Sequence, residues 1–415
     1  MTDIPIPATL PAWLERIESM HPAEIELGLD RLRQVADRLG VASLPGTVVT
    51  VAGTNGKGST VALMTALAER QGRRVCVYTS PHLHRFNERV RLPDGPAPDA
   101  RLCEAFERVE AARGDIPLTY FEFTTLAALW LFCQSGADLF LLEVGLGGRL
   151  DAVNLIDADV AVVTSVGLDH QDWLGDTREA IAREKCGIGR RHRPLVYGET
   201  DWPANLLSLI EASGASGVLA GREFEYQGGR LTLANGLSLT LPPAIRLGHD
   251  NLATACQALA LAGIPVSEAD CQAVAGLSLY GRCESFTLND RACWFDVGHN
   301  VPAVARFLSQ LPPSQGERHL VFGMMADKPI KDVVALFAGQ RVRWYLAAPA
   351  VPRAATVARL RQALPDQARS VECNSVKEAL DVALAAAKPE DQVLIFGSFF
   401  TVAEARPDGN GDQGG

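Results

Sequence analysis

A glycine-rich loop between an apolar run and a helix-forming run constrains the fold of this chain more than any other feature. Residues 48–51 are Val-Val-Thr-Val, and residues 53–59 read Gly-Thr-Asn-Gly-Lys-Gly-Ser. Residues 60–71 favour a helix that Gly72 ends. A strand, a glycine turn and a helix in this order direct backbone N–H groups and a helix N-terminus at a phosphate. The alternative is a glycine turn that binds no ligand.

The spacing inside the loop departs from the common phosphate-binding pattern. That pattern has four residues between its first glycine and the Gly-Lys pair, whereas only two separate Gly53 from Gly56 here. Lys57 can still place a charge near the β- and γ-phosphates, and Ser59 or Thr60 can place a hydroxyl near Mg²⁺. The sequence therefore predicts ATP and Mg²⁺ as cofactors.

Length and composition exclude several classes of protein. A chain of 415 residues exceeds one compact core, so we expect two or three domains. No apolar run approaches the ~20 residues of a membrane span, and the N-terminus lacks a signal peptide pattern. Nine cysteines without a CxxC pair are typical of a cytoplasmic protein, and the net charge of −10 argues against a nucleic-acid partner. We expect a cytoplasmic monomer that acts on small molecules.

The order of the expected elements indicates an α/β fold, because strands alternate with helices along most of the chain. Residues 138–145 and 160–166 are continuous apolar runs, typical of buried parallel strands. Residues 224–241 alternate apolar and polar side chains around two glycine turns, which predicts a small antiparallel excursion. The α/β pattern restarts near Gly281. We expect domains at 1–285 and 286–404, followed by a disordered tail at 405–415.

Polar side chains follow three of the expected strands. Ser80, Glu143 and His170 each lie at or just beyond a carboxyl end, where open α/β sheets bind ligands. A hydroxyl, a carboxylate and an imidazole beside a phosphate loop form a plausible magnesium shell. Singly, each residue has another interpretation, namely a turn serine, a hydrogen-bonded carboxylate and a structural histidine.

Lys185 is placed unusually for a lysine. Helical spacing from Thr177 onward puts Ile181, Lys185 and Ile188 on one buried face. A buried lysine must pair, lose its proton or be modified, and a neutral amine can react with carbon dioxide to give a carbamate. The alternative is a lysine paired with Glu184 or Glu143.

Several segments together resemble the folylpolyglutamate synthase branch of the Mur ligase superfamily. They are Gly53–Ser59, Ser80–Leu83, Leu142–Asp151, Arg183–Lys185, Gly281–Arg282, Asp296–Asn300 and the stretch around Phe396–Val402. The resemblance runs in register from about Trp13 through that last stretch. It implies an N-terminal P-loop ATPase domain, a C-terminal Rossmann-like ligase domain, and ATP-dependent joining of L-glutamate to a pteroate or folate carboxylate through an acyl phosphate.

The resemblance also implies roles for individual residues. ATP contacts fall on Thr54, Asn55, Gly56, Lys57, Gly58, Ser59, Asn251, Arg282 and Asp296, and metal ligands on Ser80, Glu143 and His170. Pteroate contacts fall on Ile25, Glu26, Leu27, Gly28, Thr119, Tyr120, Phe121, Glu122, Leu150, Asp151 and Ala152. Lys185 matches a carbamylated lysine, and Lys57, Lys185 and His170 are expected to be catalytic. Closure of the domains is expected to bring Arg282 onto the phosphates.

Some alternatives stay open at this point. Phe121 can equally be a core residue. His299, Lys328 and Ser398 are candidates for the glutamate site, with surface or capping roles as the alternative. The pteroate segments favour the bifunctional branch of the family, which acts on both 7,8-dihydropteroate and reduced folates. Other functions are a Mur-type ligase acting on a cell-wall precursor and a non-catalytic nucleotide switch.

Overall fold

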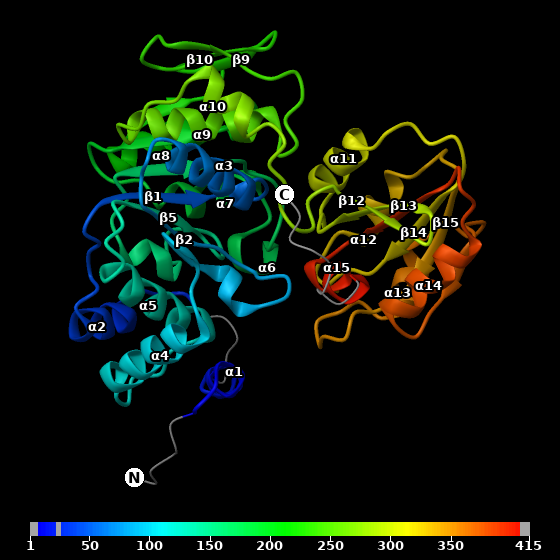
Figure 1. Ribbon diagram of the computed structural model, residues 1–415, viewed down its shortest axis with the longest axis horizontal. Coiled ribbons are helices and arrows are strands. Elements are labelled where there is room, and N and C mark those ends of the chain that lie inside the picture. The colour runs from blue at the N-terminus through cyan, green and yellow to red at the C-terminus, as the bar shows by residue number, and fades with distance from the viewer. Residues whose placement is uncertain (1–6, 22–25, 407–415) are drawn as a thin grey trace. The chain divides into compact units, whose positions relative to one another are not determined.

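The computed structural model describes residues 7–21 and 26–406, and the chain divides into two units between Leu277 and Ser278 (Figure 1). The sequence placed this boundary after residue 285. The difference arises because β12 (Glu284–Leu288) pairs with β13 (Arg291–Asp296), and Gly281 O accepts a hydrogen bond from Val297 N. Both contacts tie the residues just after Ser278 to the second unit.

The first unit is built on an eight-stranded sheet in the order β4-β3-β2-β5-β1-β6-β7-β8. Its strands are β1 (Thr47–Ala52), β2 (Val75–Tyr78), β3 (Val90–Leu92), β4 (Gly95–Pro96), β5 (Leu139–Glu143), β6 (Val160–Val163), β7 (Pro194–Tyr197) and β8 (Ser216–Leu219). All pairs are parallel except those made by the edge strands β3 and β4. Because β2, β5, β1 and β6 are adjacent and parallel, their carboxyl ends meet at one edge.

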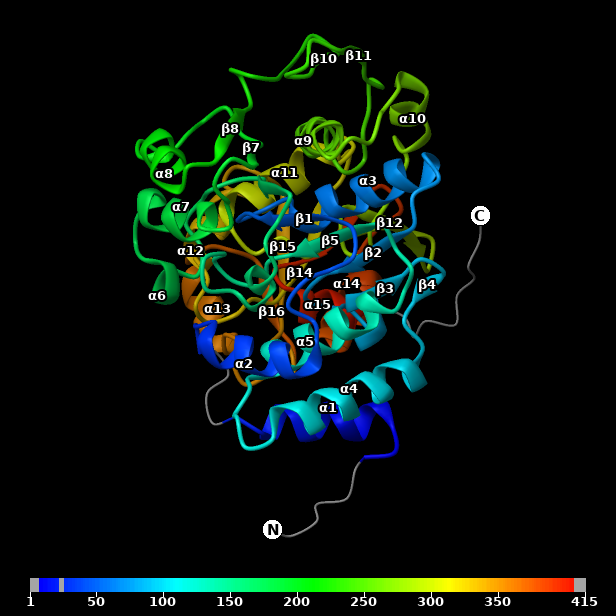
Figure 2. The same ribbon diagram turned by 90° about the vertical axis from the view of Figure 1, so that its left-hand side faces the viewer.

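Helices cover both faces of this sheet (Figures 1 and 2). On one face lie α3 (Lys57–Arg70), α9 (His249–Leu261) and α10 (Glu268–Ala273). The opposite face forms one apolar core with α1 (Leu10–Ser19), α2 (Asp30–Leu39), α4 (Asp99–Arg113), α5 (Tyr120–Cys133), α7 (Arg178–Cys186) and α8 (Leu206–Ser213). The short elements are η1 (Phe86–Arg89), η2 (Ala152–Leu155) and α6 (Gln171–Leu174).

The predicted antiparallel excursion is confirmed as a separate three-stranded sheet. It consists of β9 (Glu225–Gln227), β10 (Arg230–Thr232) and β11 (Ser238–Thr240), paired antiparallel. Gly228 and Gly229 connect the first two strands with φ of 57° and 82°, a backbone region that glycine adopts without strain.

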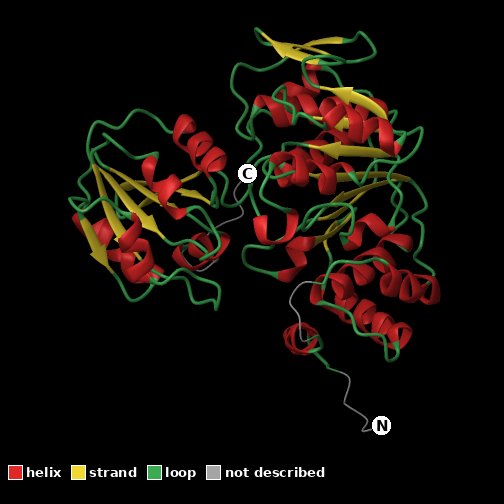
Figure 3. Cartoon of the chain, turned by 180° about the vertical axis from the view of Figure 1, so that it is seen from behind, coloured by secondary structure: helices red, strands yellow, loops and turns green. Residues whose placement is uncertain are grey.

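The second unit holds a six-stranded sheet in the order β12-β13-β17-β14-β15-β16, parallel except for β12 (Figure 3). The remaining strands are β14 (Arg318–Phe322), β15 (Val342–Leu346), β16 (Ser370–Glu372) and β17 (Gln392–Phe396). Its helices are α11 (Val301–Gln310), α12 (Ile330–Ala335), α13 (Val357–Ala363), α14 (Val376–Ala386) and α15 (Phe399–Ala405). The α/β class and the Rossmann-like second domain are therefore confirmed.

The start of the predicted disordered tail is ordered. Ala405 ends α15, and the Arg406 guanidinium donates to both carboxylate oxygens of Glu284, at 3.0 and 3.1 Å. Residues 407–415 of that tail, and Ile25 of the predicted pteroate set, lie outside the described residues. In the part of the chain that the structure describes, none of the helices has the length and apolarity that crossing a membrane requires.

Candidate active site

The predicted phosphate loop connects β1 to α3 in a conformation that requires glycine. A Cβ on Gly53 would lie 1.9 Å from Thr164 Oγ1, which is far inside van der Waals contact. Gly56 has a φ of 87°, and its Cβ would lie 2.5 Å from Asn251 Oδ1. The loop backbone therefore lies directly against its neighbours, and α3 begins at Lys57 with its first N–H groups at the sheet edge.

The end of β6 holds the loop in this shape. Thr54 Oγ1 accepts from Gly167 N at 3.0 Å, and Thr54 N donates to Ser165 O at 2.9 Å. Asn55 O accepts from the hydroxyls of Thr164 (2.7 Å) and Ser165 (3.0 Å). The sequence analysis did not identify Thr164 and Ser165 as loop contacts, although two hydroxyl residues at the end of an apolar strand could have indicated them. These hydrogen bonds within the protein fix the conformation of the loop.

Lys57 and Asn251 complete the environment of the loop. Lys57 Nζ donates to Gly53 O at 2.9 Å, so the ammonium group folds back over the loop. Asn251, buried on α9, donates from Nδ2 to Leu247 O at 2.6 Å, and its Oδ1 accepts from Thr60 Oγ1 at 3.4 Å. The Asn251 side chain therefore supports the start of α3, and its predicted contact with the nucleotide stays a prediction.

Two of the three predicted metal ligands lie together beside the loop. Ser80 N lies 3.4 Å from Glu143 Oε2 within hydrogen-bonding geometry, and a Cβ on Gly58 would lie 3.8 Å from the same oxygen. His170 precedes α6 as its N-cap residue, with a φ of 51°, directly after the buried Asp169. Across the described ranges, His, Cys, Asp and Glu side chains form no group of three that could hold a metal ion. The predicted set, which includes a serine, stays a prediction.

Lys185 is buried on α7, as the helical spacing predicted. Its exposed fraction is 5%, and Ile181 and Ile188 beside it are fully buried. Burial, with the nearby Lys57 ammonium as a second cause, lowers the pKa of Lys185 to about 7, while Asp169 and Asp151 act in the opposite direction. Glu184 is not its partner, because the Glu184 carboxylate pairs with Arg149 Nη2 at 2.9 Å.

Asp151 stabilises the loop after β5. Its Oδ2 accepts from Leu146 N at 2.8 Å and its Oδ1 from Val153 N at 3.0 Å, where it caps η2. Burial raises the pKa of this carboxyl to about 6, and the backbone hydrogen bonds and the Lys57 ammonium limit the rise. The buried Lys185, Asp151 and Asp169 and the partly exposed Lys57 thus form one group of interacting charges.

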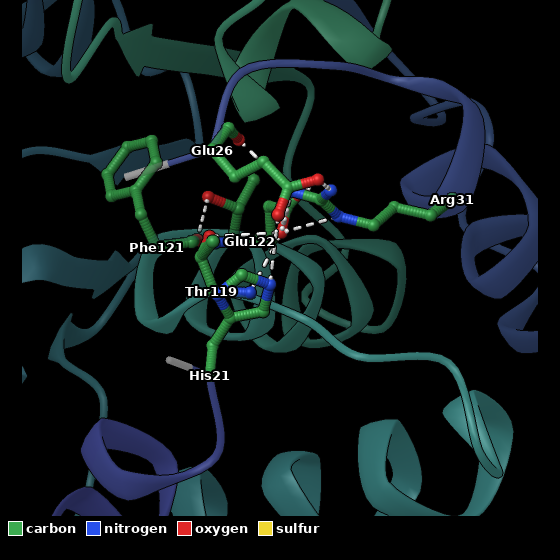
Figure 4. Close-up of polar contacts among 7 residues, drawn as sticks. His21, Glu26, Arg31, Thr119, Phe121 and Glu122 are labelled. Carbon is green, nitrogen blue, oxygen red and sulfur yellow. Dashed lines mark hydrogen bonds and ion pairs between the residues drawn. The ribbon is translucent and has the colours of Figure 1, made fainter. Parts of the chain in front are cut away.

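Four residues of the predicted pteroate set, Glu26, Thr119, Phe121 and Glu122, lie together at the start of α5 (Figure 4). The Phe121 ring covers Gly145 so closely that a Cβ there would lie 2.7 Å from Phe121 Cζ. Glu122 is buried, and its Oε2 accepts from Thr119 N (2.8 Å) and Thr119 Oγ1 (3.0 Å) in a capping box. Arg31 connects Glu122 to Glu26. Phe121 is partly exposed, whereas Glu122 is buried and engaged within the protein.

The predicted residues of the second unit have contacts within that unit. Asp296, at the end of β13, accepts from Cys283 N at 2.8 Å and Gly298 N at 2.7 Å, and burial raises its pKa. The Arg282 guanidinium lies 5.5 Å from the centre of the Phe399 ring. Ser398, a glutamate-site candidate, caps α15 by accepting from Thr401 N at 3.0 Å, which is the alternative that the sequence left open.

The other two glutamate-site candidates also lie in the second unit. His299 Nδ1 lies 3.0 Å from Val297 O, and Lys328 Nζ lies 3.5 Å from the carboxylate of Asp327. Both stay predictions.

Comparisons with known proteins agree with this architecture. Residues 51–219 match the Mur ligase middle domain, and residues 281–399 match the Mur ligase glutamate ligase domain. The dihydrofolate synthase/folylpolyglutamate synthase of Escherichia coli K12 is 43% identical over 402 residues, which is 95% of this chain and 94% of that protein.

Solved structures are similar over the same extent. A structure of E. coli FolC in complex with DHPP and ADP has a TM-score of 0.88 and 42% identity, covering 95% of this chain and 96% of that one. A bifunctional folylpolyglutamate synthase/dihydrofolate synthase with Mn, AMPPNP and L-glutamate bound has a TM-score of 0.87 and 40% identity, covering 96% and 98%.

Proposed function

The chain belongs to the dihydrofolate synthase/folylpolyglutamate synthase family of Mur ligases, and we propose on this basis that it joins L-glutamate to 7,8-dihydropteroate and to reduced folates. It is an ATP-dependent acid–amino-acid ligase that uses a divalent metal ion. The observation that carries the proposal is the glycine loop at the carboxyl edge of β1, with Ser80 and Glu143 beside it.

The reaction requires activation of a poor acyl donor. The substrate carboxylate attacks the γ-phosphorus of ATP, which gives an acyl phosphate and ADP. The amine of L-glutamate then attacks the acyl carbon, and the tetrahedral intermediate collapses with release of phosphate and a proton. Because both steps build up negative charge, catalysis depends on positioning and electrostatic stabilisation rather than on a protein nucleophile.

The described residues suit these demands. We assign the phosphates of ATP to Lys57 and the N–H groups of residues 56–59 at the start of α3. Thr54 and Asn55 support this loop, because their own N–H groups donate to Ser165. We assign the metal to Ser80, Glu143 and His170, since hydroxyl and carboxylate oxygens suit a Mg²⁺ ion, with the imidazole as one unusual nitrogen ligand. When bound, Mg²⁺ would neutralise charge on the phosphate oxygens. Asn251, Arg282 and Asp296 remain proposed nucleotide contacts.

We assign Lys185 as the carbamylated residue. A pKa of about 7 leaves about half of this amine neutral at pH 7, which is the form that reacts with carbon dioxide. In the modification, the amine nitrogen bonds to the carbon of CO₂ and a proton leaves to solvent. The product is an anion, which suits a site beside the Lys57 ammonium.

The remaining assignments follow the substrate. We propose that Leu27, Gly28, Phe121, Leu150 and Ala152 surround the pteridine and benzoate rings, with Phe121 as the stacking face. Thr119, Tyr120 and Glu122, with Glu26 and Asp151, complete the proposed set. We further propose that the protein works as a cytoplasmic monomer. Its proposed partners are small molecules, since a net charge of −10 disfavours a nucleic-acid partner.

Product analysis tests the function directly. Purified protein is incubated with ATP, Mg²⁺ and L-glutamate, with 7,8-dihydropteroate or a reduced folate in separate reactions, and products are identified by mass. We expect one added glutamate on either substrate, and none with Lys57→Ala. Addition to the folate alone would reject the dihydropteroate activity. Addition to a nucleotide-linked muramoyl substrate, with neither pteridine accepted, would instead support the cell-wall ligase.

A further inference from the structure

Arg31, which sequence reasoning did not single out, connects two segments of the proposed pteroate site. It lies in the first turn of α2, and its side chain points between Glu26 and Glu122 (Figure 4). Arg31 Nε and Nη2 donate to the Glu122 carboxylate oxygens at 3.0 Å each. Nη2 also donates to the backbone carbonyl of Glu26 at 3.0 Å, and Nη1 pairs with the Glu26 carboxylate.

The Glu122 end of this connection is rigid. Glu122 is 3% exposed, and besides Arg31 its carboxylate accepts from the N–H and hydroxyl of Thr119. The capping box fixes the first turn of α5, which carries the Phe121 ring. A buried carboxylate held by a forked guanidinium makes a strong, directional contact. Arg31 is therefore anchored on the element that presents the proposed stacking ring.

The Glu26 end has one strong and one weak contact. The Glu26 side chain is 49% exposed, and carboxylate–guanidinium pairs that reach solvent contribute little. The hydrogen bond to the Glu26 carbonyl acts on the backbone and does not depend on that side chain. The guanidinium of Arg31 thus holds the main chain at residue 26 relative to the start of α5.

The other arginines of α2 make different contacts. Arg33 forms an exposed pair with Asp30 at 3.4 Å, and Arg38 donates to the carbonyls of Ala112 and Arg113. Arg33 therefore offers a matched control on the same helix.

From this geometry we propose that Arg31 is a positioning residue for the pteridine end of the substrate. It sets the distance between the backbone at residues 26–28 and the Phe121 ring, and so keeps both in place for one flat ring system. The inference rests on the proposed function. Because dihydropteroate and reduced folates share the pteridine, both activities depend on Arg31 equally, whereas ATP binding does not.

Steady-state kinetics of three variants test this proposal. Arg31→Gln is expected to raise KM for dihydropteroate and for tetrahydrofolate about tenfold, with KM for ATP within about twofold of wild type. Arg31→Lys keeps the charge without the fork and is expected to fall between wild type and Arg31→Gln. Arg33→Gln, on the same helix but outside the proposed site, is expected to change KM less than about twofold.

A second variant guards against unfolding, because Arg31→Gln leaves the Glu122 carboxylate buried without its guanidinium. The double variant Arg31→Gln/Glu122→Gln removes that charge, and a raised pteridine KM in this variant at wild-type Tm supports positioning. Equal increases in all three KM values, or pteridine KM values matching those of Arg33→Gln, would overturn the inference alone. A wild-type protein that ligates neither pteridine would instead reject the proposed function.

Discussion

Replacing Lys185 with Ala should leave ATP binding intact and abolish ligation. The side chain lies among Lys57, Asp151 and Asp169, and its own pKa is lowered to about 7. The amine rather than the ammonium is the reactive form, so the expected role of Lys185 depends on that lowered pKa. Lys185→Arg is the matched control, because arginine keeps a positive charge and cannot form the carbamate at neutral pH.

The structure sets the size of the effect. Lowering the pKa from 10.5 to about 7 corresponds to about 5 kcal/mol against charging this group in the fold. At pH 7 about half of the Lys185 amines are neutral, compared with about one in 3,000 for a lysine at the unperturbed value. The fraction of Lys185 in the reactive neutral form is therefore about a thousandfold larger than that of a surface lysine at the same pH.

The assay follows recovery of ligation after CO₂ has been removed. Protein is degassed at low pH, returned to buffers between pH 6 and 9 at a fixed CO₂ concentration, and sampled for product over time. The recovery rate should rise about fivefold from pH 6 to 7 and level off above pH 8, since the neutral fraction saturates beyond a pKa of about 7. With ¹³CO₂, a carbamate carbon resonance should appear in wild type and be absent from Lys185→Arg.

Three results would contradict this reasoning. A recovery rate that still increases tenfold per pH unit up to pH 9 would mean that the Lys185 pKa is not lowered. Full ligation by Lys185→Ala would remove the carbamate from the mechanism. Loss of ATP binding in both variants, followed with a fluorescent nucleotide, would assign Lys185 to nucleotide binding instead.

Three further predictions concern the framework of the site. Gly53→Ala should weaken nucleotide binding at least about tenfold, because its Cβ would lie 1.9 Å from a hydroxyl of β6's end, whereas Gly276→Ala, whose Cβ meets nothing within 4 Å, should bind normally. The folded-state pKa of Asp151 is raised to about 6, so the folded protein takes up a proton as the pH falls. Lowering the pH from 7 to 4 should therefore stabilise wild type relative to Asp151→Asn by up to about 3 kcal/mol, measured by urea unfolding. No change in this difference would reject the raised pKa. Arg406→Ala should lower the unfolding free energy of the second unit by about 1–2 kcal/mol, since Arg406 pairs with Glu284 and stacks on two rings; an unchanged thermal transition would contradict this.

The parallel strands were predictable because burial on both faces leaves a continuous apolar run, as in Leu139–Glu143. The antiparallel edge strand β12 was not, since its half-exposed residues alternate in burial and lack such a run. The start of α3 was also misplaced. Residues 57–59, Lys-Gly-Ser, favour a loop by propensity, but the anchoring of the preceding loop to β6 lets the helix begin at Lys57.

The first turn of α5 also allowed more than one interpretation of the sequence. The resemblance assigned Thr119, Tyr120, Phe121 and Glu122 to the substrate, and the structure starts α5 at Tyr120 with Thr119 as its cap. The pattern Thr-x-x-Glu is also a capping box, so one motif supported two interpretations. In the fold both are compatible, because a capped first turn holds Phe121 over Gly145.

The two buried carboxylates of the predicted pteroate set bear on how such a site can be specific. Glu122 accepts from Thr119 and Arg31, and Asp151 accepts from the backbone N–H groups of Leu146 and Val153. A carboxylate whose acceptor positions are occupied in this way has limited capacity left to bind a ligand. Removing the carboxylate, however, would release the backbone segment that contacts the ligand. Residues of a motif can therefore be indispensable to a substrate that they barely contact. For this site, we expect Phe121 to contribute the binding affinity for the substrate, while Arg31, Glu122 and Asp151 hold the binding segments in position.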